Sequence, residues 1–217
     1  MSEAAAHTTK TADGAFLRSR LGSLLSLFPL GVWSVNHIWN NLAAFKGAQA
    51  WQAAVTDYPH PLAHLVTMIV VLLPLVLHAI WGISRMSQMR PNIHKYPFFG
   101  NLKYTLQRLA ALGLLLFLGA HIWLAMLRPR FVEGRPEAFA DLSREMHHHT
   151  PTLLVYLLGT LGASYHLANG AHSFAMGWGI VVSQKALKRF DLVAMGLFAV
   201  LLGMGWAAIY ALWVAGT

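Results

Sequence analysis

Four histidines stand in stretches of chain that contain no Lys, Arg, Asp or Glu: His37, His78, His121 and His166. A neutral imidazole brings one hydrogen-bond donor and one acceptor, and burying them unpaired costs a few kcal/mol. An imidazole nitrogen is also a common metal ligand. Each of these rings therefore needs either a hydrogen-bonding partner or a metal. Which of the two applies depends on how the segments that carry the histidines are placed relative to one another.

Composition indicates that those elements lie in a membrane. Of the 217 residues, 56% are hydrophobic and only 11% are charged, whereas a soluble domain carries about a quarter charged residues. The chain has no cysteine, which excludes disulfides, thiolate chemistry and iron–sulfur clusters ligated by this chain. We therefore predict an all-α integral membrane protein.

Five charge-free runs are each long enough to cross a bilayer as a helix, which takes about 20 residues. We predict a five-helix transmembrane domain over residues 21–217, with spans at about 21–45, 60–84, 107–128, 151–182 and 190–214. The fourth is too long for one straight span, so its glycine-rich end near "GWGIVVS" is expected to bend or to lie in the interface.

Basic residues predict the orientation of these spans. Eleven of the 16 Lys and Arg residues fall in the N-terminal segment and in the second-to-third and fourth-to-fifth connections. The positive-inside rule then places the N-terminus in the cytoplasm and the C-terminus outside. Residues 1–20 are expected to be a cytoplasmic extension with no removable signal. The net charge of +8 is thus a topology signal, and no nucleic-acid partner is expected.

Helical rise places the histidines in two layers. At about 1.5 Å per residue, His78 and His166 lie roughly 8–10 Å from the inner face of the hydrocarbon core. His121 lies roughly 10 Å from the outer face, and His37 falls near the same level. His172 lies about 120° round the helix from His166, so it cannot share that face, and we expect it nearer the cytoplasmic side.

Two imidazoles on opposing helices at one depth are what bis-histidine ligation of a haem iron requires, with each Nδ1–H left to a carbonyl or hydroxyl. A single intramembrane histidine is more often an interhelical hydrogen-bond partner, but four histidines paired by depth weaken that interpretation. The run His147–His149 could bind Zn²⁺, although three consecutive side chains cannot all face one ion on a helix. The sequence thus predicts a bundle of four helices around two stacked haems b.

Five stretches, in this order and spacing, resemble a known family: "RSRLGSLLSLFPLGVWSVNHIWNN", "LHAIWGI", "NLKYTLQRLA", "GAHIWLA" and "YHLANGAHSFAMGWGIVVS". The chain resembles the five-helix, dihaem cytochrome b anchor subunit of succinate:quinone oxidoreductases, the succinate dehydrogenases of the tricarboxylic acid cycle and the related fumarate reductases. The likeness is closest to the single-subunit anchors of menaquinone-using bacteria and covers nearly the whole chain from Arg18.

The resemblance implies a role for each histidine. His37 and His121 would bind the iron of the outer haem, and His78 and His166 that of the inner haem, in agreement with the counted depths. The chain would not oxidise succinate by itself. It would anchor a flavoprotein (FAD) subunit and an iron–sulfur subunit on the cytoplasmic side of the bacterial membrane and pass electrons to menaquinone or another quinone.

Further contacts are expected at the cofactors. Propionates would meet cationic or polar groups at the inner ends of the spans, and the candidates are Arg20, Ser23, Gln107, Arg108 and His172. Asp57 is the candidate acid–base for quinone, and His60 and His64 either serve the quinone or line the interface. The chain departs from some relatives at Ser164, where they have a proton-transferring Glu, and at Gly177, where they have a Lys that binds a propionate.

Two other functions stay open on the sequence. The chain could be the haem b subunit of another respiratory complex, a hydrogenase or a nitrate reductase, or it could be a haem-free anchor in which the histidines only bridge helices. A transporter is disfavoured because no acidic residue lies well inside a span.

Overall fold

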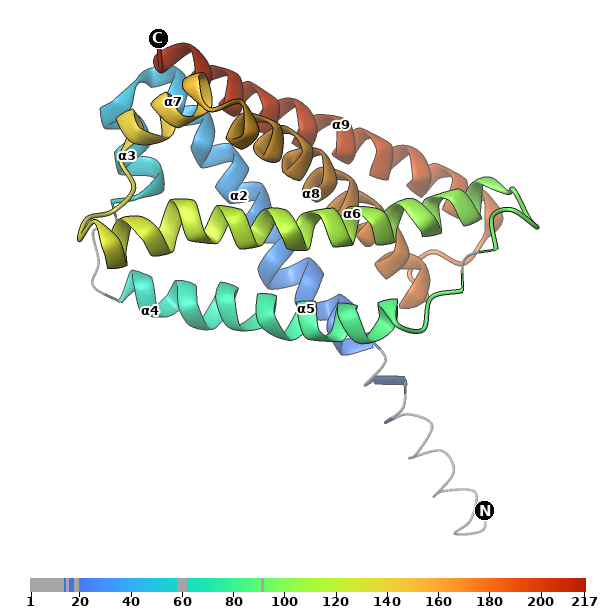
Figure 1. Cartoon of the computed structure of the whole chain (residues 1–217). Coiled ribbons are helices and arrows are strands. Elements are labelled where there is room, and N and C mark those ends of the chain that lie inside the picture. Colours follow the sequence, from blue (N-terminus) through green and yellow to red (C-terminus); the bar gives the residue numbers. More distant parts are fainter. Residues whose placement is uncertain (1–13, 15, 18–19, 58–61, 91) are drawn as a thin grey trace.

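The computed structural model describes residues 14, 16–17, 20–57, 62–90 and 92–217. All regular structure among these residues is helical (Figure 1). The predicted extension 1–20 and His60 lie mostly or wholly outside the described residues. The helical segments are η1 (Ser26–Gly31), α2 (Val32–Asn41), η2 (Leu42–Lys46), α3 (Ala48–Val55), α4 (Ala63–Thr67), η3 (Met68–Leu72), α5 (Leu73–Met86), α6 (Phe99–Ile122), η4 (Trp123–Val132), α7 (Phe139–His148), α8 (Thr150–Gly177) and α9 (Gln184–Ala215).

Within the described part of the chain, four continuous helical stretches are long and apolar enough to cross a membrane: Arg20–Lys46, Leu65–Met86, Phe99–Val132 and Gln184–Ala215. Their centres coincide with the first, second, third and fifth predicted spans. The third is longer than expected, because the helix begins at Phe99 and carries Lys103 and Arg108 within its first turns. Charged residues mark the predicted limit of the apolar core, but they do not interrupt the helix.

The remaining predicted span corresponds to α8, which has 28 residues but is not among those four stretches. Its polar side chains lower its hydropathy, and several of them are buried in the bundle, including Thr152, Ser164 and His172. A helix surrounded by other helices does not have to be apolar on every face. The helix ends at Gly177, and Gly179 adopts a positive φ of 70°, so the chain turns in the glycine-rich stretch before α9.

Wider helical turns occur where prolines disturb the ladder of hydrogen bonds. Pro29 lies inside η1 and Pro129 inside η4, while η3 directly precedes the turn that contains Pro74. Proline lacks an N–H and its ring collides with the carbonyl four residues earlier, so a helix that continues through it must widen or bend. The spans therefore continue past these prolines.

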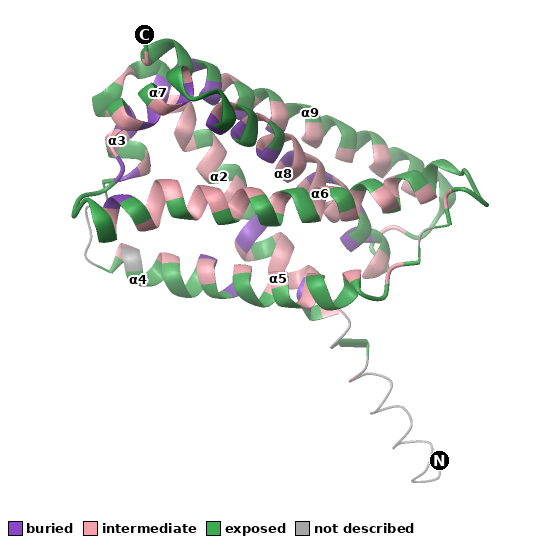
Figure 2. Ribbon diagram, in the orientation of Figure 1, coloured by how far each residue is buried: buried purple, intermediate pink, exposed green. Residues whose placement is uncertain are grey.

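Helix α8 is the centre of the bundle. It packs along α6 and α9 and also contacts α7 and η1. The buried residues gather where α3, α7, α8 and α9 meet, around Trp51, Met146 and Leu212. Elsewhere large apolar side chains such as Leu116 and Leu192 are exposed, and Figure 2 shows exposed residues along the outward faces of the long helices. Such a surface suits lipid rather than water.

The bundle has two distinct ends. The short helices α3 and α7 and the C-terminus cover one end, which we call the α7 end (Figure 1). The connections 87–98 and 178–183 lie at the other, which we call the opposite end.

Candidate functional site

The structure brings the four intramembrane histidines together in two pairs. His37 of α2 faces His121 of α6 with their ring centroids 5.9 Å apart and an angle of 66° between the planes. His78 of α5 faces His166 of α8 at 6.2 Å, again at 66°. These are the two pairs expected from depth, and each joins two helices.

The ring separations are those of ligands on either side of one metal ion. Two metal–nitrogen bonds of about 2 Å each, with the ring radii added, would place the centroids about 6 Å apart. Direct hydrogen bonding between two imidazoles would orient the rings for N–H···N contact, and none of the hydrogen bonds of the described residues joins the two members of either pair. The geometry therefore fits axial ligation of an iron between the rings.

The Nδ1 atoms of three of these histidines have their own partners. That of His78 lies 3.0 Å from the carbonyl oxygen of Gly22, and that of His121 lies 3.1 Å from the hydroxyl of Tyr156. A histidine that binds metal through Nε2 donates its Nδ1–H to just such oxygen atoms, which fixes the tautomer and the ring orientation. The carbonyl and hydroxyl partners expected from the sequence are thus present at two sites.

At His166 the partner is an amide. Its Nδ1 lies 3.1 Å from Nε2 of Gln107, which also donates to the His166 carbonyl at 3.0 Å. Asn169 Nδ2 donates to Oε1 of the same glutamine at 2.9 Å. Nδ1 of His166 is the acceptor in this arrangement, and the Gln107 side chain would have to move before that nitrogen could donate, because reversing the amide would set Oε1 against the His166 carbonyl oxygen.

His37 is held by stacking. Its ring lies 4.6 Å from that of Trp33, nearly parallel at 10°. Its carbonyl accepts from Nδ2 of Asn41, whose Oδ1 in turn accepts from the indole N–H of Trp51. This chain of contacts connects α2 with the buried cluster at the α7 end.

Glycines next to the inner pair differ in what they face. A Cβ at Gly82 would meet no atom within 4 Å, whereas one at Gly22 would lie 2.1 Å from the Trp81 ring. One at Gly162 would lie 3.5 Å from the carbonyl oxygen of Ala110 on α6. Gly82 therefore borders open space one turn after His78, while Gly22 and Gly162 allow close packing.

The five candidate propionate residues are placed differently. Arg20 and Arg108 each have a buried Nε without a partner. The guanidinium of Arg20 also lies where a side chain at Gly177 would be, since a Cβ there would be 2.5 Å from its Nη1. The guanidinium of Arg20 thus lies in the space next to Gly177, the position where some relatives are expected to carry a propionate-binding lysine.

The other three candidates are engaged in protein contacts. Ser23 Oγ donates to the Arg20 carbonyl and accepts from the Trp178 indole, and Gln107 is bound as above. His172 Nε2 lies 3.1 Å from a carboxylate oxygen of Asp191, to which Lys103 also pairs. His172 thus faces α9, in agreement with its expected position on another face of α8 from His166.

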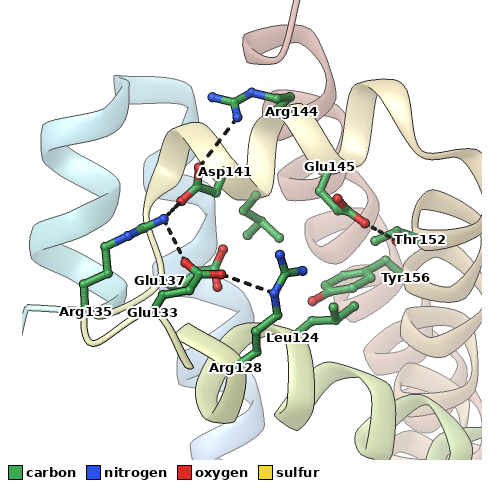
Figure 3. Close-up of a pocket in the computed structure, with 11 residues that line it drawn as sticks. Leu124, Arg128, Glu133, Arg135, Glu137, Asp141, Arg144, Glu145, Thr152 and Tyr156 are labelled. Atoms are coloured by element: carbon green, nitrogen blue, oxygen red, sulfur yellow. Dashed lines mark hydrogen bonds and ion pairs between the residues drawn. The ribbon is translucent and has the colours of Figure 1, made fainter. Parts of the chain in front are cut away.

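A polar cavity of about 240 Å³ opens at the α7 end (Figure 3). Tyr156, the partner of His121, is part of its wall, and the rest is lined by Arg128, Glu133, Arg135, Glu137, Asp141, Arg144, Glu145, Thr152 and two leucines. Asp57, the candidate quinone residue, is exposed and is not part of this wall. The sequence did not single out Glu137, because this residue follows Pro136 in a loop that contains several other charged residues.

The histidine run at the same end is used for packing contacts. His147 Nδ1 lies 3.0 Å from the Trp213 carbonyl, and His149 contacts Glu145 and Thr152. Within the part of the chain that the structure describes, no three His, Cys, Asp or Glu side chains are grouped to hold a metal ion.

Comparison with known proteins gives one full-length relative. The chain is 28% identical to the "Succinate dehydrogenase cytochrome b558 subunit" of Bacillus subtilis (strain 168) over 197 residues, which are 90% of this chain and 96% of the relative. The predicted resemblance is confirmed. No protein-family model and no solved structure matches the chain. The likeness to a succinate dehydrogenase cytochrome b subunit thus rests on that relative and covers 90% of this chain.

Proposed function

We propose that this chain is the membrane-anchoring cytochrome b subunit of a succinate:quinone oxidoreductase. It would pass electrons from an iron–sulfur subunit to membrane quinone through two haems b, held by His78 with His166 and by His37 with His121. The observation that carries the proposal is the pair of histidine layers, each with ring centroids about 6 Å apart. The relative's name supports the enzyme to which the chain is assigned.

The residues around each pair fit a haem. Gly82 borders open space beside His78, and two buried guanidinium nitrogens, of Arg20 and Arg108, lack a protein partner. Propionate carboxylates would supply those partners through charge-assisted hydrogen bonds.

A bound haem b supplies reversible one-electron iron chemistry, and the protein tunes it. The histidines fix the orientation of each site. The Gly22 carbonyl and the Tyr156 hydroxyl lie at Nδ1 of His78 and His121; as acceptors they would make these imidazoles more basic and so favour the oxidised state of a bound haem. Arg20 and Arg108 would offset the negative propionates and favour the reduced state. The surrounding apolar helices would keep water from both sites.

The arrangement in the membrane follows from the charges. We propose five spans, with α8 as the fourth, residues 1–20 as a cytoplasmic extension, and the C-terminus outside. The opposite end, with Arg85, Arg90 and Lys95, would face the cytoplasm and dock the flavoprotein and iron–sulfur subunits. The α7 end would then face the outer aqueous phase, where quinone is reduced close to the outer haem. Asp57 remains a candidate there.

The decisive experiment is purification of the complex from membranes, with haem b measured against covalent flavin. We expect two haems b per flavin, together with co-purifying flavoprotein and iron–sulfur subunits. A colourless complex would leave only a haem-free anchor, and nickel–iron or molybdenum partners would assign the chain to a hydrogenase or a nitrate reductase.

The pairing itself is tested by His166→Ala. Removing one axial ligand of the inner site should abolish the inner haem signal in the reduced-minus-oxidised spectrum and leave the outer one in place. The matched control is His172→Gln, a second buried histidine of α8 that faces Asp191, and this variant should retain both haems. Retention of both signals in His166→Ala would refute the assignment.

A further inference from the structure

One carboxyl in the cavity at the α7 end is set apart from the others. The Glu137 residue is 92% buried, with only 8% of its surface exposed, yet it lines the cavity. None of the ion pairs formed by the described residues includes it. A buried carboxyl without an ion-pair partner is costly when ionised. Its place beside a polar cavity therefore indicates a role other than stabilising the fold.

The neighbouring charges already satisfy one another. Glu133 pairs with Arg128 at 3.2 Å and with Arg135 at 2.8 Å. Asp141 pairs with Arg135 and, at 3.9 Å, with Arg144. Glu145 accepts from the Thr152 hydroxyl and contacts His149. Figure 3 draws the ion pairs of Glu133 and Asp141 and the hydrogen bond between Glu145 and Thr152, with no dashed line to Glu137.

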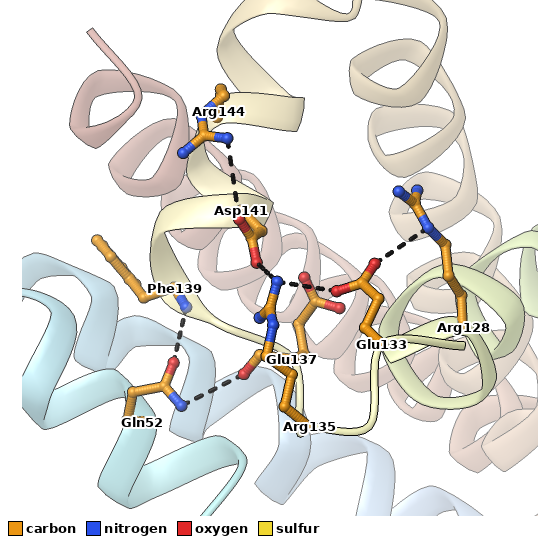
Figure 4. Close-up of polar contacts among 8 residues, drawn as sticks. All are labelled: Gln52, Arg128, Glu133, Arg135, Glu137, Phe139, Asp141 and Arg144. Atoms are coloured by element: carbon orange, nitrogen blue, oxygen red, sulfur yellow. Dashed lines mark hydrogen bonds and ion pairs between the residues drawn. The ribbon is translucent and has the colours of Figure 1, made fainter. Parts of the chain in front are cut away.

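Glu137 is also held firmly in place. Gln52 of α3 donates from Nε2 to the Glu137 carbonyl at 3.3 Å and accepts from the Phe139 amide at 2.7 Å (Figure 4). A side-chain amide thus binds both ends of a three-residue segment that begins just after Pro136. The backbone that carries the carboxyl is therefore held in place by α3.

These surroundings make Glu137 exchange protons near neutral pH. Burial raises its pKa to about 7, and the negative charges of Asp141 and Glu133 act in the same direction, while Arg135 and Arg128 oppose them. Arg144 and Glu145 are the other charged groups of the cavity wall. A carboxyl in this range changes its protonation with small changes in local charge.

The cavity leads to the outer histidine pair. Tyr156 forms part of its wall, and the tyrosine hydroxyl lies 3.1 Å from Nδ1 of His121. One side chain therefore separates the cavity of Glu137 from the ring proposed as an iron ligand. A change of charge at the His37–His121 pair would shift the pKa of Glu137, because the buried groups between them screen charge weakly.

We propose that Glu137 is the group that takes up and releases protons when the haem proposed at His37 and His121 is reduced and oxidised. This inference rests on the proposed function. Glu137 would take up one proton from the aqueous phase at the α7 end when an electron reaches the outer haem, and release it when that electron passes to quinone. Two such cycles deliver two electrons and two protons, which convert one quinone to one quinol. The carboxyl returns to its starting state after each cycle.

The test is the midpoint potential of each haem as a function of pH in the purified complex. In the wild type the potential of the outer haem should fall as the pH rises through about 7 and level off on either side. In Glu137→Gln, which mimics the protonated carboxyl, it should stay at the low-pH level throughout. The inner haem should behave alike in both proteins.

Two further variants make the result specific. Asp191→Asn removes a carboxyl at the opposite end of the bundle, where it pairs with Lys103, and should leave the pH dependence of the outer haem potential as it is in the wild type. Glu133→Gln removes a neighbouring negative charge and releases Arg128 and Arg135, and both effects should move the inflection to lower pH. This variant keeps the inference testable even where Glu137→Gln does not assemble.

The outcomes separate this inference from the function on which it rests. A complex without haem would contradict the proposed function. A complex with both haems whose outer potential keeps its pH dependence in Glu137→Gln, or loses it in Asp191→Asn, would overturn the role of Glu137 alone. An inflection that does not move in Glu133→Gln would overturn it as well.

Discussion

At three of the four paired histidines, Nδ1 connects the site to the rest of the protein. His78 is connected to the backbone of the first helix through Gly22, and His121 to α8 through Tyr156. The two sites therefore use acceptors of different strength and flexibility. Such differences are one means of giving two haems b different potentials.

Tyr156→Phe tests this connection. Loss of the hydroxyl acceptor leaves the His121 ring less basic, so the outer haem should remain bound but have a higher midpoint potential. Tyr156 contacts His121 of the outer pair, so the potential of the proposed inner haem should be unchanged. Redox titration of both haems measures the effect, and an unchanged or lowered outer potential would contradict the hydrogen bond.

The raised pKa of Glu137 also predicts how stability depends on pH. Its folded pKa of about 7 exceeds the ordinary value of 4.5, so the native state holds the proton more tightly and loses stability as the pH rises from about 4.5 to 7. The penalty at pH 8 is on the order of 2–3 kcal/mol. Glu137→Gln should thus raise the melting temperature at pH 8 and have little effect at pH 4.5, as followed by thermal denaturation in detergent.

The sequence could predict the histidines but not what surrounds them. Counting helical rise places the histidines at common depths, because depth along a straight span depends on local sequence alone. Tyr156 lies 35 positions from His121, and Gln52 lies 87 positions from Phe139. Contacts of this kind depend on how helices are rotated against one another, so Glu137 resembled any other loop glutamate.

Among the helices, the contact between α8 and α9 depends on small residues. Gly205 is buried in α9, and a Cβ at this position would lie 2.3 Å from Cγ2 of Thr160. Small residues of this type let membrane helices approach closely. A larger side chain must push the two helices apart.

Gly205→Val should therefore destabilise the bundle by about 1–3 kcal/mol, the usual cost of overpacking. The matched control is Gly203→Val, two residues away on the exposed side of α9, where a Cβ meets nothing within 4 Å. Melting curves of the two purified variants provide the comparison. Equal melting temperatures would show that the helices do not pack as described.

Helix existence was easier to predict than helix ends. Charge-free runs identify the apolar part of each span, but a helix continues as long as its hydrogen bonds do, as α6 does from Phe99 through its charged first turns. Helix α7 was not predicted, although its buried residues Phe139, Leu142 and Met146 stand three and four positions apart, as on one face of a helix.

At the scale of the whole molecule, the number of spans determines which ends share an aqueous phase. The chain has no native cysteine, so single cysteines can be labelled without background. Asn92→Cys and Thr217→Cys introduce thiols at exposed positions at the two ends of the bundle. Five spans should make Thr217→Cys reactive to an impermeant maleimide in intact cells, and Asn92→Cys reactive only after permeabilisation. Labelling of both from one side would show that α8 does not cross.

No helix carries a member of both histidine pairs: α2 and α6 carry one pair, and α5 and α8 the other. A substitution that tilts or shifts a single helix therefore disturbs one pair while the second keeps its two histidines. Each of the two proposed haem sites could accordingly change, or be lost, on its own during evolution. Descendants of such a bundle could retain one cofactor and still fold.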